Sequence, residues 1–247
     1  MSQFDDFAQA YQLAAELPYR VHSVVPAMRE VVGDVTGLRV LDLGSGTGTV
    51  TRQYAQWGAA RVVGTDISGG MLEIARAHDG DHPNVEYMQL DGANPTNDTG
   101  LDGQFDLVSS VFVLPFAANQ EQLSGFFVTA RKALPPVGGR FVAVVVNPDY
   151  VRNPEDYYAP YGFTIGQSGG YEGAPLVLNV ASQGAPVRFS AYWWSRETYE
   201  ECATTAGFTT LLWINPTVTE EGLAKFGPEY WTAFTAAPVA TILDART

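Results

Sequence analysis

The sequence predicts an α/β fold: a Rossmann-like, mostly parallel seven-stranded sheet with helices on both faces and a lid-like insertion after the fifth strand. Three observations predict this fold. Between residues 40 and 147, short β-branched apolar runs alternate with helical patterns. The first run ends in the glycine-rich stretch VLDLGSGTGTV, residues 40–50. The chain has 247 residues, 46% of them hydrophobic and 17% charged, which is enough for one elaborated domain with a sizeable core.

Each element of this core has its own local signal. Apolar runs that end at turns predict strands at residues 39–43, 60–67, 85–90, 105–114, 140–146 and 208–214. Helical periodicity predicts helices at residues 49–58, 68–78, 119–134 and 195–207. Ser68 and Ser195 are expected as N-caps, and Gly58 and Gly207 as helix ends.

The pattern changes after residue 147. A stretch rich in Gly, Pro and Tyr follows, with a possible hairpin that pairs residues 176–180 with residues 187–194. We therefore expect four parts in one elaborated domain. They are an N-terminal helical lid (1–36), the ligand-binding core (37–147), a substrate-capping insertion (148–194) and the C-terminal part of the same α/β domain (195–247).

Composition excludes several classes of partner. The formal net charge is -13, and no run of Lys and Arg suggests a basic patch, so nucleic acids and anionic membrane surfaces are not expected partners. The single cysteine, Cys202, permits no intramolecular disulfide and no zinc spacing, and it is expected in the core. The first residues carry acids where a secretion signal needs bases. A cytoplasmic protein with a small-molecule substrate is the expectation, and the oligomeric state stays open.

The glycine-rich turn predicts a ligand site. In an open parallel sheet, ligands bind outside the carboxyl ends of the strands, where the first turn directs backbone N–H groups and a positive helix end outward. Gly44, Gly46 and Gly48 lie on that turn and let the backbone approach a ligand closely. A purely structural turn is the alternative at this point.

Two acids after the next strands indicate what the ligand is. Asp66 ends a strand about 20 residues beyond the glycines, the spacing at which a carboxylate accepts both ribose hydroxyls. Asp91 closes the following strand and can accept a hydrogen bond from an adenine amine. Thr49 replaces the third glycine of a pyrophosphate-binding turn, and the carboxylate of Asp42 favours an amino group over a phosphate. Amino group, ribose and adenine together describe S-adenosylmethionine better than NAD.

At these residues the chain resembles a known family, the class I S-adenosylmethionine-dependent methyltransferases. The matching stretches, in order, are VLDLGSGTG, GTDIS, LDG, FDLVSSVFVL and LPPVGGRFVAV. More narrowly, FDDFAQAYQLAAELPYR, SSVFVLPFA, YWWSRETYEECATTAGF and PEYWTAF resemble a bacterial small-molecule subgroup that includes the N-methyltransferase of toxoflavin biosynthesis. That subgroup often has asparagine and tyrosine where this chain has Pro115 and Phe116, which puts a shared substrate in doubt.

The resemblance implies a set of cofactor-binding residues. They are Tyr11, Arg20, Asp42, Gly44, Ser45, Gly46, Gly48, Asp66, Ile67, Met71, Asp91, Gly92 and Ser110. By this resemblance, residues 44–48 would wrap the methionine part of the cofactor, Asp66 would hold the ribose, and Ile67 would lie against the adenine. Asp91 and Gly92 read the edge of the base. Tyr11 and Arg20 belong to a helix that closes over the cofactor, with Arg20 paired to the methionine carboxylate; a solvated surface charge is the alternative for Arg20.

The acceptor pocket is expected to be aromatic, because aromatic faces stack planar rings and stabilise a methylsulfonium. The expected substrate-binding residues are Phe4, Phe7, Asn147, Tyr161, Phe163, Tyr192, Trp193 and Trp194, with Tyr157 and Tyr158 nearby. These aromatic rings could instead only pack the lid. Methyl transfer from a sulfonium has a good leaving group, so alignment and desolvation can supply most of the acceleration. His22 is the one candidate general base, His78 and His82 are expected in solvent, and no metal site is expected.

The leading hypothesis is therefore methyl transfer to a small, planar heteroaromatic or secondary-metabolite acceptor, with nitrogen favoured over oxygen or carbon. Antibiotic biosynthesis is one setting for such a reaction. An alkyl-transferring, cyclising enzyme with the same cofactor is the first alternative. A nicotinamide-dependent reductase is disfavoured by the misplaced glycine and by the lack of a Tyr-x-x-x-Lys pair. A cofactor-binding protein without turnover is a further alternative.

Overall fold

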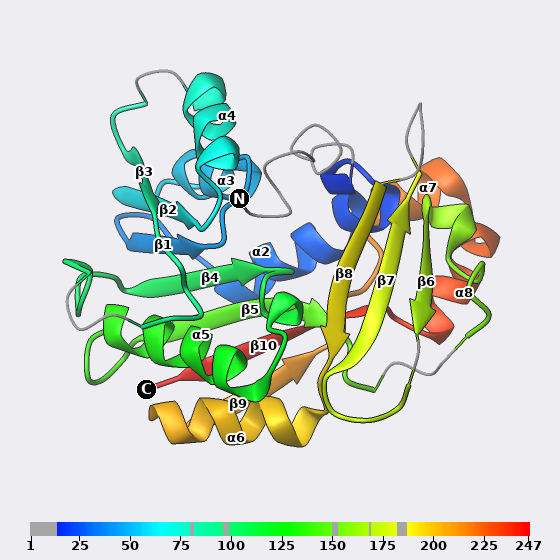
Figure 1. Cartoon of the computed structure of the whole chain (residues 1–247). Coiled ribbons are helices and arrows are strands. Elements are labelled where there is room, and N and C mark those ends of the chain that lie inside the picture. Colours follow the sequence, from blue (N-terminus) through cyan, green and yellow to red (C-terminus); the bar gives the residue numbers. More distant parts are fainter. Residues whose placement is uncertain (1–13, 80–81, 96–98, 150–152, 168, 182–186) are drawn as a thin grey trace.

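A seven-stranded sheet forms the centre of the protein (Figure 1). The computed structural model describes residues 14–79, 82–95, 99–149, 153–167, 169–181 and 187–247. The strand order is β3-β2-β1-β4-β5-β10-β9, and of these strands β10 alone runs in the direction opposite to the others. The strands are β1 (Arg39–Leu43), β2 (Arg61–Asp66), β3 (Val85–Gln89), β4 (Leu107–Val111), β5 (Arg140–Val146), β9 (Thr210–Ile214) and β10 (Ala240–Arg246). The expected mostly parallel seven-stranded sheet is confirmed.

Both faces of the sheet are buried, which explains why its strands read as continuous apolar runs. In β5, Val142, Val144 and Val146 face one hydrophobic core. The alternating residues Phe141, Ala143 and Val145 face the other. The first core receives residues from helices η1 (Arg20–Val24), α2 (Val25–Val32) and α3 (Thr49–Gln56), and η1 also packs against α2. The second core receives residues from helices α5 (Gln120–Ala133) and α6 (Arg196–Ala206).

Helix α4 (Gly69–Asp79) packs against β2 and β3. The predicted caps are present: the Ser68 hydroxyl accepts a hydrogen bond from the Met71 N–H, and the Ser195 hydroxyl accepts one from the Thr198 N–H. Cys202 is buried on α6, as expected. Among the described residues, no helix combines the length and the apolar character that crossing a membrane requires.

The segment after β5 forms a second sheet of β6 (Phe163–Gln167), β7 (Ala174–Val180) and β8 (Val187–Trp193). The predicted hairpin is confirmed, with Leu178 opposite Phe189, whereas strand β6 and the short helix η3 (Ala159–Tyr161) carry no clear signal in the sequence. Two more helices, α7 (Glu220–Phe226) and α8 (Pro228–Ala236), also escaped prediction; they pack against each other. The Tyr158 hydroxyl donates to the carbonyl of Ala237, which joins the insertion to the end of α8.

Strand β10 inserts between β5 and β9 and carries a buried ion pair. The carboxylate of Asp244 is 2% exposed and lies 2.9 Å from Arg140 Nη2 and 2.8 Å from Arg246 Nη2. Arg140 also donates to the carbonyls of Val31 and Val32 at the end of α2. One carboxylate thereby orients the arginine that joins the sheet to α2.

We expect Asp244→Ala to lower the free energy of unfolding by about 2–3 kcal/mol, because it leaves a partly buried arginine without its counter-charge. Urea unfolding measures this loss. Asp156→Ala, which removes an exposed acid, is the control and is expected to change stability by less than about 0.5 kcal/mol. A loss equal to that of the control would contradict the structural role of Asp244.

Candidate ligand-binding site

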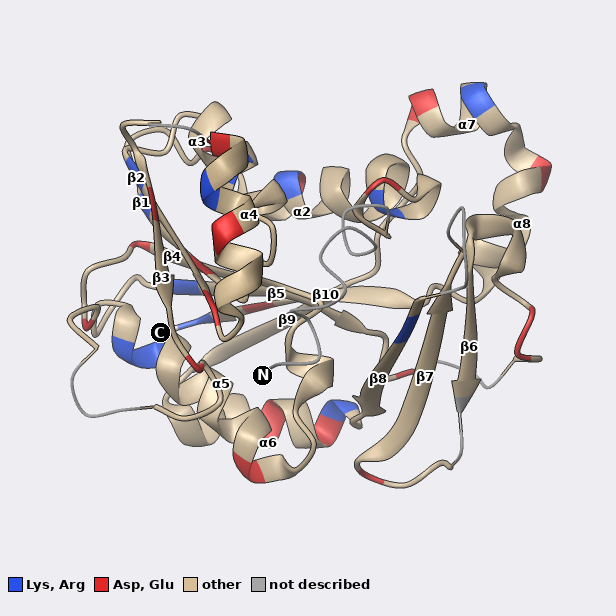
Figure 2. Cartoon of the chain, turned by 45° about the horizontal axis from the view of Figure 1, so that its top comes forward, with Lys and Arg blue, Asp and Glu red and all other residues tan. Residues whose placement is uncertain are grey.

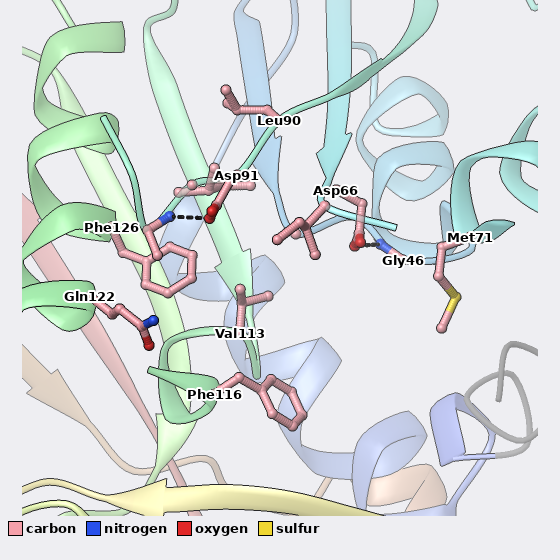
Figure 3. Close-up of a pocket in the computed structure, with 14 residues that line it drawn as sticks. Gly46, Asp66, Met71, Leu90, Asp91, Val113, Phe116, Gln122 and Phe126 are labelled. Atoms are coloured by element: carbon pink, nitrogen blue, oxygen red, sulfur yellow. Dashed lines mark hydrogen bonds between the residues drawn. The ribbon is translucent and has the colours of Figure 1, made fainter. Parts of the chain in front are cut away.

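A cavity of about 290 Å³ opens at the carboxyl ends of β1, β2, β3 and β4 (Figure 3). We call it the main cavity. Its position is the one at which open parallel sheets bind ligands, where the strand order reverses between β1 and β4. Its walls are formed by Leu43, Gly44, Gly46, Asp66, Ile67, Met71, Leu90, Asp91, Gly92, Ala93, Val113, Phe116, Gln122 and Phe126.

The turn between β1 and α3 forms one wall, and its conformation requires glycine. Gly44 and Gly48 have φ angles of 78° and 80°, which side chains rarely adopt. A Cβ on Gly44 would lie 2.3 Å from Val113 Cγ2, and one on Gly48 would lie 2.2 Å from the Tyr87 hydroxyl. Side chains therefore pack closely against both glycines, and Gly44 and Gly46 line the main cavity.

Asp66 connects this turn to the next helix. Its Oδ2 accepts a hydrogen bond of 2.9 Å from the Gly46 N–H, and its Oδ1 accepts one of 2.9 Å from the Ser68 N–H. Ile67 lies beside it with 47% of its surface exposed, and Met71 is buried at the cavity wall. Figure 3 shows Asp66 and Met71 on the same side of the cavity. A carboxylate and an exposed apolar side chain thus lie next to each other.

Asp91 and Gly92 form the opposite wall after β3. Asp91 Oδ1 accepts a hydrogen bond of 3.1 Å from the Ala93 N–H, and its other oxygen accepts one from the Asn94 side-chain amide. A Cβ on Gly92 would lie 2.8 Å from Leu43 Cδ1. Two fixed carboxylates, Asp66 and Asp91, therefore line one cavity with apolar side chains between them.

A smaller recess of about 20 Å³, the side cavity, lies behind Gly44 and is also lined by Arg20, Asp42 and Ser45. Asp42 is 1% exposed, and its Oδ2 accepts a hydrogen bond of 2.7 Å from the Thr51 hydroxyl. Burial raises the pKa of Asp42 to about 7, the Thr51 bond opposes this, and the charge of Asp66 adds to it. The Ser45 hydroxyl has no hydrogen-bond partner among the described residues.

The raised pKa predicts a pH-dependent stability. Asp42 in the folded protein binds its proton more tightly than Asp42 in the unfolded chain does. The contribution of Asp42 to the free energy of unfolding therefore falls as the pH rises from 3.8, the ordinary pKa of an aspartic acid, to about 7. That difference corresponds to on the order of 4 kcal/mol. We expect Asp42→Asn to gain stability relative to the unmodified protein over this range, with a constant gain above pH 7. Urea unfolding at a series of pH values measures it, and a pH-independent difference would contradict it.

A third space, the apolar groove, has a volume of about 60 Å³ and lies between the N-terminal helical segment, the end of β4 and the inserted sheet. It is lined by Ala14, Tyr19, Arg20, Phe112, Pro115, Phe116, Val146, Phe163, Leu178, Val180, Phe189, Ala191 and Val239. The three spaces share walls. Gly44 borders the main and side cavities, Phe116 the main cavity and the groove, and Arg20 the side cavity and the groove.

The structure brings most of the predicted cofactor residues together at these spaces. Gly48 is the turn residue that leads into α3. Ser110 is different: it is fully buried in β4, and its hydroxyl donates a hydrogen bond of 3.0 Å to the carbonyl of Leu43. It joins β4 to β1 and lines neither cavity. Tyr11 lies outside the described residues, as do Phe4 and Phe7 among the predicted substrate residues.

The aromatic residues of the insertion are placed differently from the expectation. Of the predicted substrate-binding residues, Phe163 lines the apolar groove, and Phe189, which was not predicted, also lines it. Tyr161 is 1% exposed, and its hydroxyl donates to the carbonyl of Tyr230 at 2.6 Å. Trp194 is 4% exposed and donates to the carbonyl of Ala117. These two rings pack the core because their polar atoms find backbone partners there, so they do not form an acceptor wall.

Four further candidates do not line the three spaces. Trp193 donates to the carbonyl of Pro148, and Tyr192 packs against the core on the α5 side of the sheet. The amide of Asn147 donates to the carbonyl of Pro238, and its oxygen accepts from the Asp149 N–H. His22 is 4% exposed and its ring lies 5.6 Å from that of Phe226. The expectation of His22 as a general base is therefore not supported by its position.

Several wall residues were not predicted from the sequence. Val113, Gln122 and Phe126 line the main cavity, and Phe112 lines the groove. Their one sequence signal is position, because Phe112 and Val113 follow β4, and Gln122 and Phe126 lie on the next long helix, α5. Within the described ranges, no group of three or more His, Cys, Asp or Glu side chains comes together in a way that could hold a metal ion.

Comparison with known proteins relates this geometry to a family. Residues 40–138 match the family model of a methyltransferase domain. A demethylmenaquinone methyltransferase of Tropheryma whipplei (strain Twist) is 36% identical over 132 residues, which are 53% of this chain and 49% of that protein. The N-demethylindolmycin N-methyltransferase of Streptomyces griseus is 27% identical over 180 residues, 68% of each chain. The chain thus spans about half the length of the first of these relatives.

A solved structure shows the same fold. The S-adenosylmethionine-dependent methyltransferase from Mesorhizobium loti superposes with a TM-score of 0.66 over 94% of this chain and 99% of that one, at 23% sequence identity. At this identity the likeness concerns the fold. Residues 40–138 therefore match the methyltransferase domain family, and the sheet that they help to build has the Rossmann-like fold of the S-adenosylmethionine-dependent methyltransferases.

Proposed function

We propose that this protein is a class I S-adenosylmethionine-dependent methyltransferase that acts on a small acceptor molecule. The observation that carries this proposal is the main cavity, in which the glycine turn and the carboxylates of Asp66 and Asp91 lie at the ends of neighbouring strands. The match of residues 40–138 to a methyltransferase domain supports it.

The residues of the main cavity fit an adenosine. A carboxylate has about four lone-pair positions, so Asp66 can accept from two backbone N–H groups and also from ribose hydroxyls. Ile67 offers an exposed apolar surface to a planar base, and Asp91 offers an oxygen to the amine of adenine. A Cβ at Gly44 or Gly92 would meet neighbouring side chains, so both walls depend on glycine.

The side cavity fits the amino-acid end of the same cofactor. Asp42 can attract the ammonium group, and Arg20 can pair with the carboxylate. When bound, S-adenosylmethionine supplies a methyl group that is attached to a sulfonium sulfur. That sulfur is a good leaving group when the methyl group is transferred. The protein's residues then have to align the acceptor and exclude water, as the apolar lining of the groove does.

For the acceptor, we propose a small, planar heteroaromatic or secondary-metabolite molecule, with nitrogen favoured over oxygen or carbon. The relative that methylates N-demethylindolmycin supports a setting in antibiotic biosynthesis. The resemblance to the toxoflavin N-methyltransferase subgroup, the cytoplasmic location, the absence of nucleic-acid partners and the lid-like roles of residues 1–36 and 148–194 stay predictions. Mass analysis of the product separates methylation from the alternative of alkyl transfer with cyclisation.

Calorimetric titration tests the proposal. The purified protein is titrated with S-adenosylmethionine and S-adenosylhomocysteine, and with NAD and NADP in parallel. Micromolar binding of the first pair, without binding of the nicotinamide pair, is the expected result. Binding of only NAD or NADP would overturn the proposed function and favour the reductase alternative, and the fold would stand.

A further inference from the structure

The glycine turn is held in place at two separate points. In its first half, residues 44–46, the N–H groups of Gly44 and Ser45 both donate to the carbonyl of Thr65 on β2 at 2.7 Å. In its second half, residues 47–49, the carbonyl of Thr47 accepts a hydrogen bond of 3.0 Å from Nη1 of Arg52 on α3. The two halves of the turn therefore depend on different partners.

The two halves also border the cavities differently. In the first half, Gly44 and Gly46 line the main cavity, and Gly44 and Ser45 line the side cavity. In the second half, Thr47 and Thr49 line the side cavity. In the proposed function the main cavity takes the adenosine and the side cavity takes the amino-acid end of the cofactor. A movement of the second half is therefore expected to act on the amino-acid end.

Arg52, which holds the second half, is itself held by an ion pair. It lies near the start of α3, where the helix dipole disfavours a positive charge. Asp79 at the end of α4 compensates that charge, because its Oδ1 lies 3.0 Å from Arg52 Nη1 and its side chain is only 3% exposed. Figure 2 shows α3 and α4 side by side, with charged residues of both signs on this pair of helices. One guanidinium nitrogen thus joins α4 to the carbonyl of Thr47.

Tyr87 on β3 completes this set of contacts. Its hydroxyl donates a hydrogen bond to Oδ2 of Asp79, so both oxygens of that carboxylate have a partner. Its ring also packs closely against the backbone of the turn and of β2. A Cβ on Gly48 would lie 2.2 Å from the Tyr87 hydroxyl, and a Cβ on Gly64 would lie 2.7 Å from Tyr87 Cε1. The ring therefore fits only because both positions are glycine.

We propose that Arg52, Asp79 and Tyr87 form a positioning network that fixes the second half of the glycine turn and thereby sets the affinity for the amino-acid end of the cofactor. We call it the turn network. A fully paired polar network is rigid, and a site that is held in shape before the ligand arrives loses less freedom on binding. These three side chains are not among the described cavity walls, so they act through the turn. The inference rests on the proposed function insofar as the side cavity takes the amino-acid end.

The test compares two ligands that share an adenosine, S-adenosylhomocysteine and 5′-methylthioadenosine, of which the second lacks the amino-acid end. Each is titrated calorimetrically into the full chain and into Arg52→Met, which keeps a long side chain but has no donor. We expect the variant to bind S-adenosylhomocysteine at least about tenfold more weakly and 5′-methylthioadenosine within about threefold of the unmodified protein. A general loss of stability has no reason to distinguish the two ligands. Equal weakening of both, or weakening of neither, would overturn the proposal.

Arg61→Met is the matched control. Arg61 also forms an ion pair, with Glu86 at 3.0 Å, and its side chain is 34% exposed compared with 26% for Arg52. It begins β2, at the opposite end of the strand from Asp66 and the turn. We expect both ligands to bind this control within about twofold of the unmodified protein. A control that weakened S-adenosylhomocysteine as much as Arg52→Met does would show that the effect is not specific to the turn network.

Tyr87→Phe tests the network from its other end and removes only one hydroxyl group. Asp79 then loses one of its two partners and holds Arg52 less firmly. We expect S-adenosylhomocysteine to bind at least about threefold more weakly, and 5′-methylthioadenosine to bind within about twofold of the unmodified protein. An unchanged ratio of the two affinities would overturn the role of Tyr87. Should Arg52→Met not fold, this ratio in Tyr87→Phe decides the whole proposal.

The unmodified protein separates this test from that of the proposed function. If it binds neither ligand, the proposed function fails, and the inference that rests on it fails too. If it binds both ligands equally well, the amino-acid end adds nothing to binding, and only the present inference fails. If it prefers S-adenosylhomocysteine and Arg52→Met keeps that preference in full, the cofactor site stands and the turn network is overturned.

Discussion

Replacing Asp66 by alanine is expected to lower the affinity for S-adenosylhomocysteine by at least about 100-fold. Hydrogen bonds to a charged acceptor contribute about 1.5–3 kcal/mol each, and the proposed pair of ribose bonds is lost together. The side chain also holds the Gly46 and Ser68 N–H groups at 2.9 Å, so the variant loosens the glycine turn. Both effects act in the same direction.

The variant Asp66→Asn separates the two effects. An amide oxygen can still accept from one backbone N–H group, but the amide nitrogen cannot accept from a ribose hydroxyl. We expect its affinity to lie between those of the unmodified protein and Asp66→Ala, and Asp156→Ala, at an exposed acid, to leave affinity unchanged. Calorimetry provides all four values. An Asp66→Ala affinity within about threefold of the unmodified protein would show that this carboxylate does not hold the ligand.

Strands β1 to β5 could be predicted because each forms an apolar run that is visible in the local sequence. Strand β5 is apolar on both faces since both of its faces are buried. The ends of β1 and β2 were equally clear, because the glycine turn and Asp66 obey a spacing that the topology imposes. The structure indeed brings them within one hydrogen bond of each other, between Asp66 and Gly46.

Strand β10 was not located, and its sequence explains why. It reads ATILDAR, with an acid and a base in seven residues, although its register places it between β5 and β9. Asp244 is tolerated there only because Arg140 and Arg246 pair with it. Arg140 lies more than 100 residues away from Asp244 in the sequence, so no local pattern predicts the ion pair between them.

The aromatic residues of the insertion could not be assigned from the sequence for a similar reason. A tyrosine that packs a core and one that lines a groove look alike until the partner of its hydroxyl is known. Tyr158 and Tyr161 donate to carbonyls of Ala237 and Tyr230, which are distant in sequence. Conversely, the direction of the Phe112 ring depends on one positive φ angle, and the presence of a phenylalanine in the sequence does not predict such an angle.

Replacing Gly44 by alanine is the second change for which we expect a large effect. The new Cβ would lie 2.3 Å from Cγ2 and 2.7 Å from Cγ1 of Val113, so Val113 has to move. Because Val113 itself lines the main cavity, its displacement changes the volume that the adenosine would fill. A misplaced wall and a strained turn together predict at least about 100-fold weaker binding of S-adenosylhomocysteine, equivalent to about 2.7 kcal/mol.

Gly138→Ala is the matched control for backbone strain. Gly138 has a φ of 80°, close to the 78° of Gly44, but no atom lies within 4 Å of a Cβ built on it. This variant should lose about 1–2 kcal/mol of stability from its conformation alone and keep full affinity. The double variant Gly44→Ala with Val113→Ala removes both clashing methyl groups and should recover part of the lost affinity. If it recovers none, the loss in Gly44→Ala comes from the strained turn itself, and contact with Val113 is not its cause.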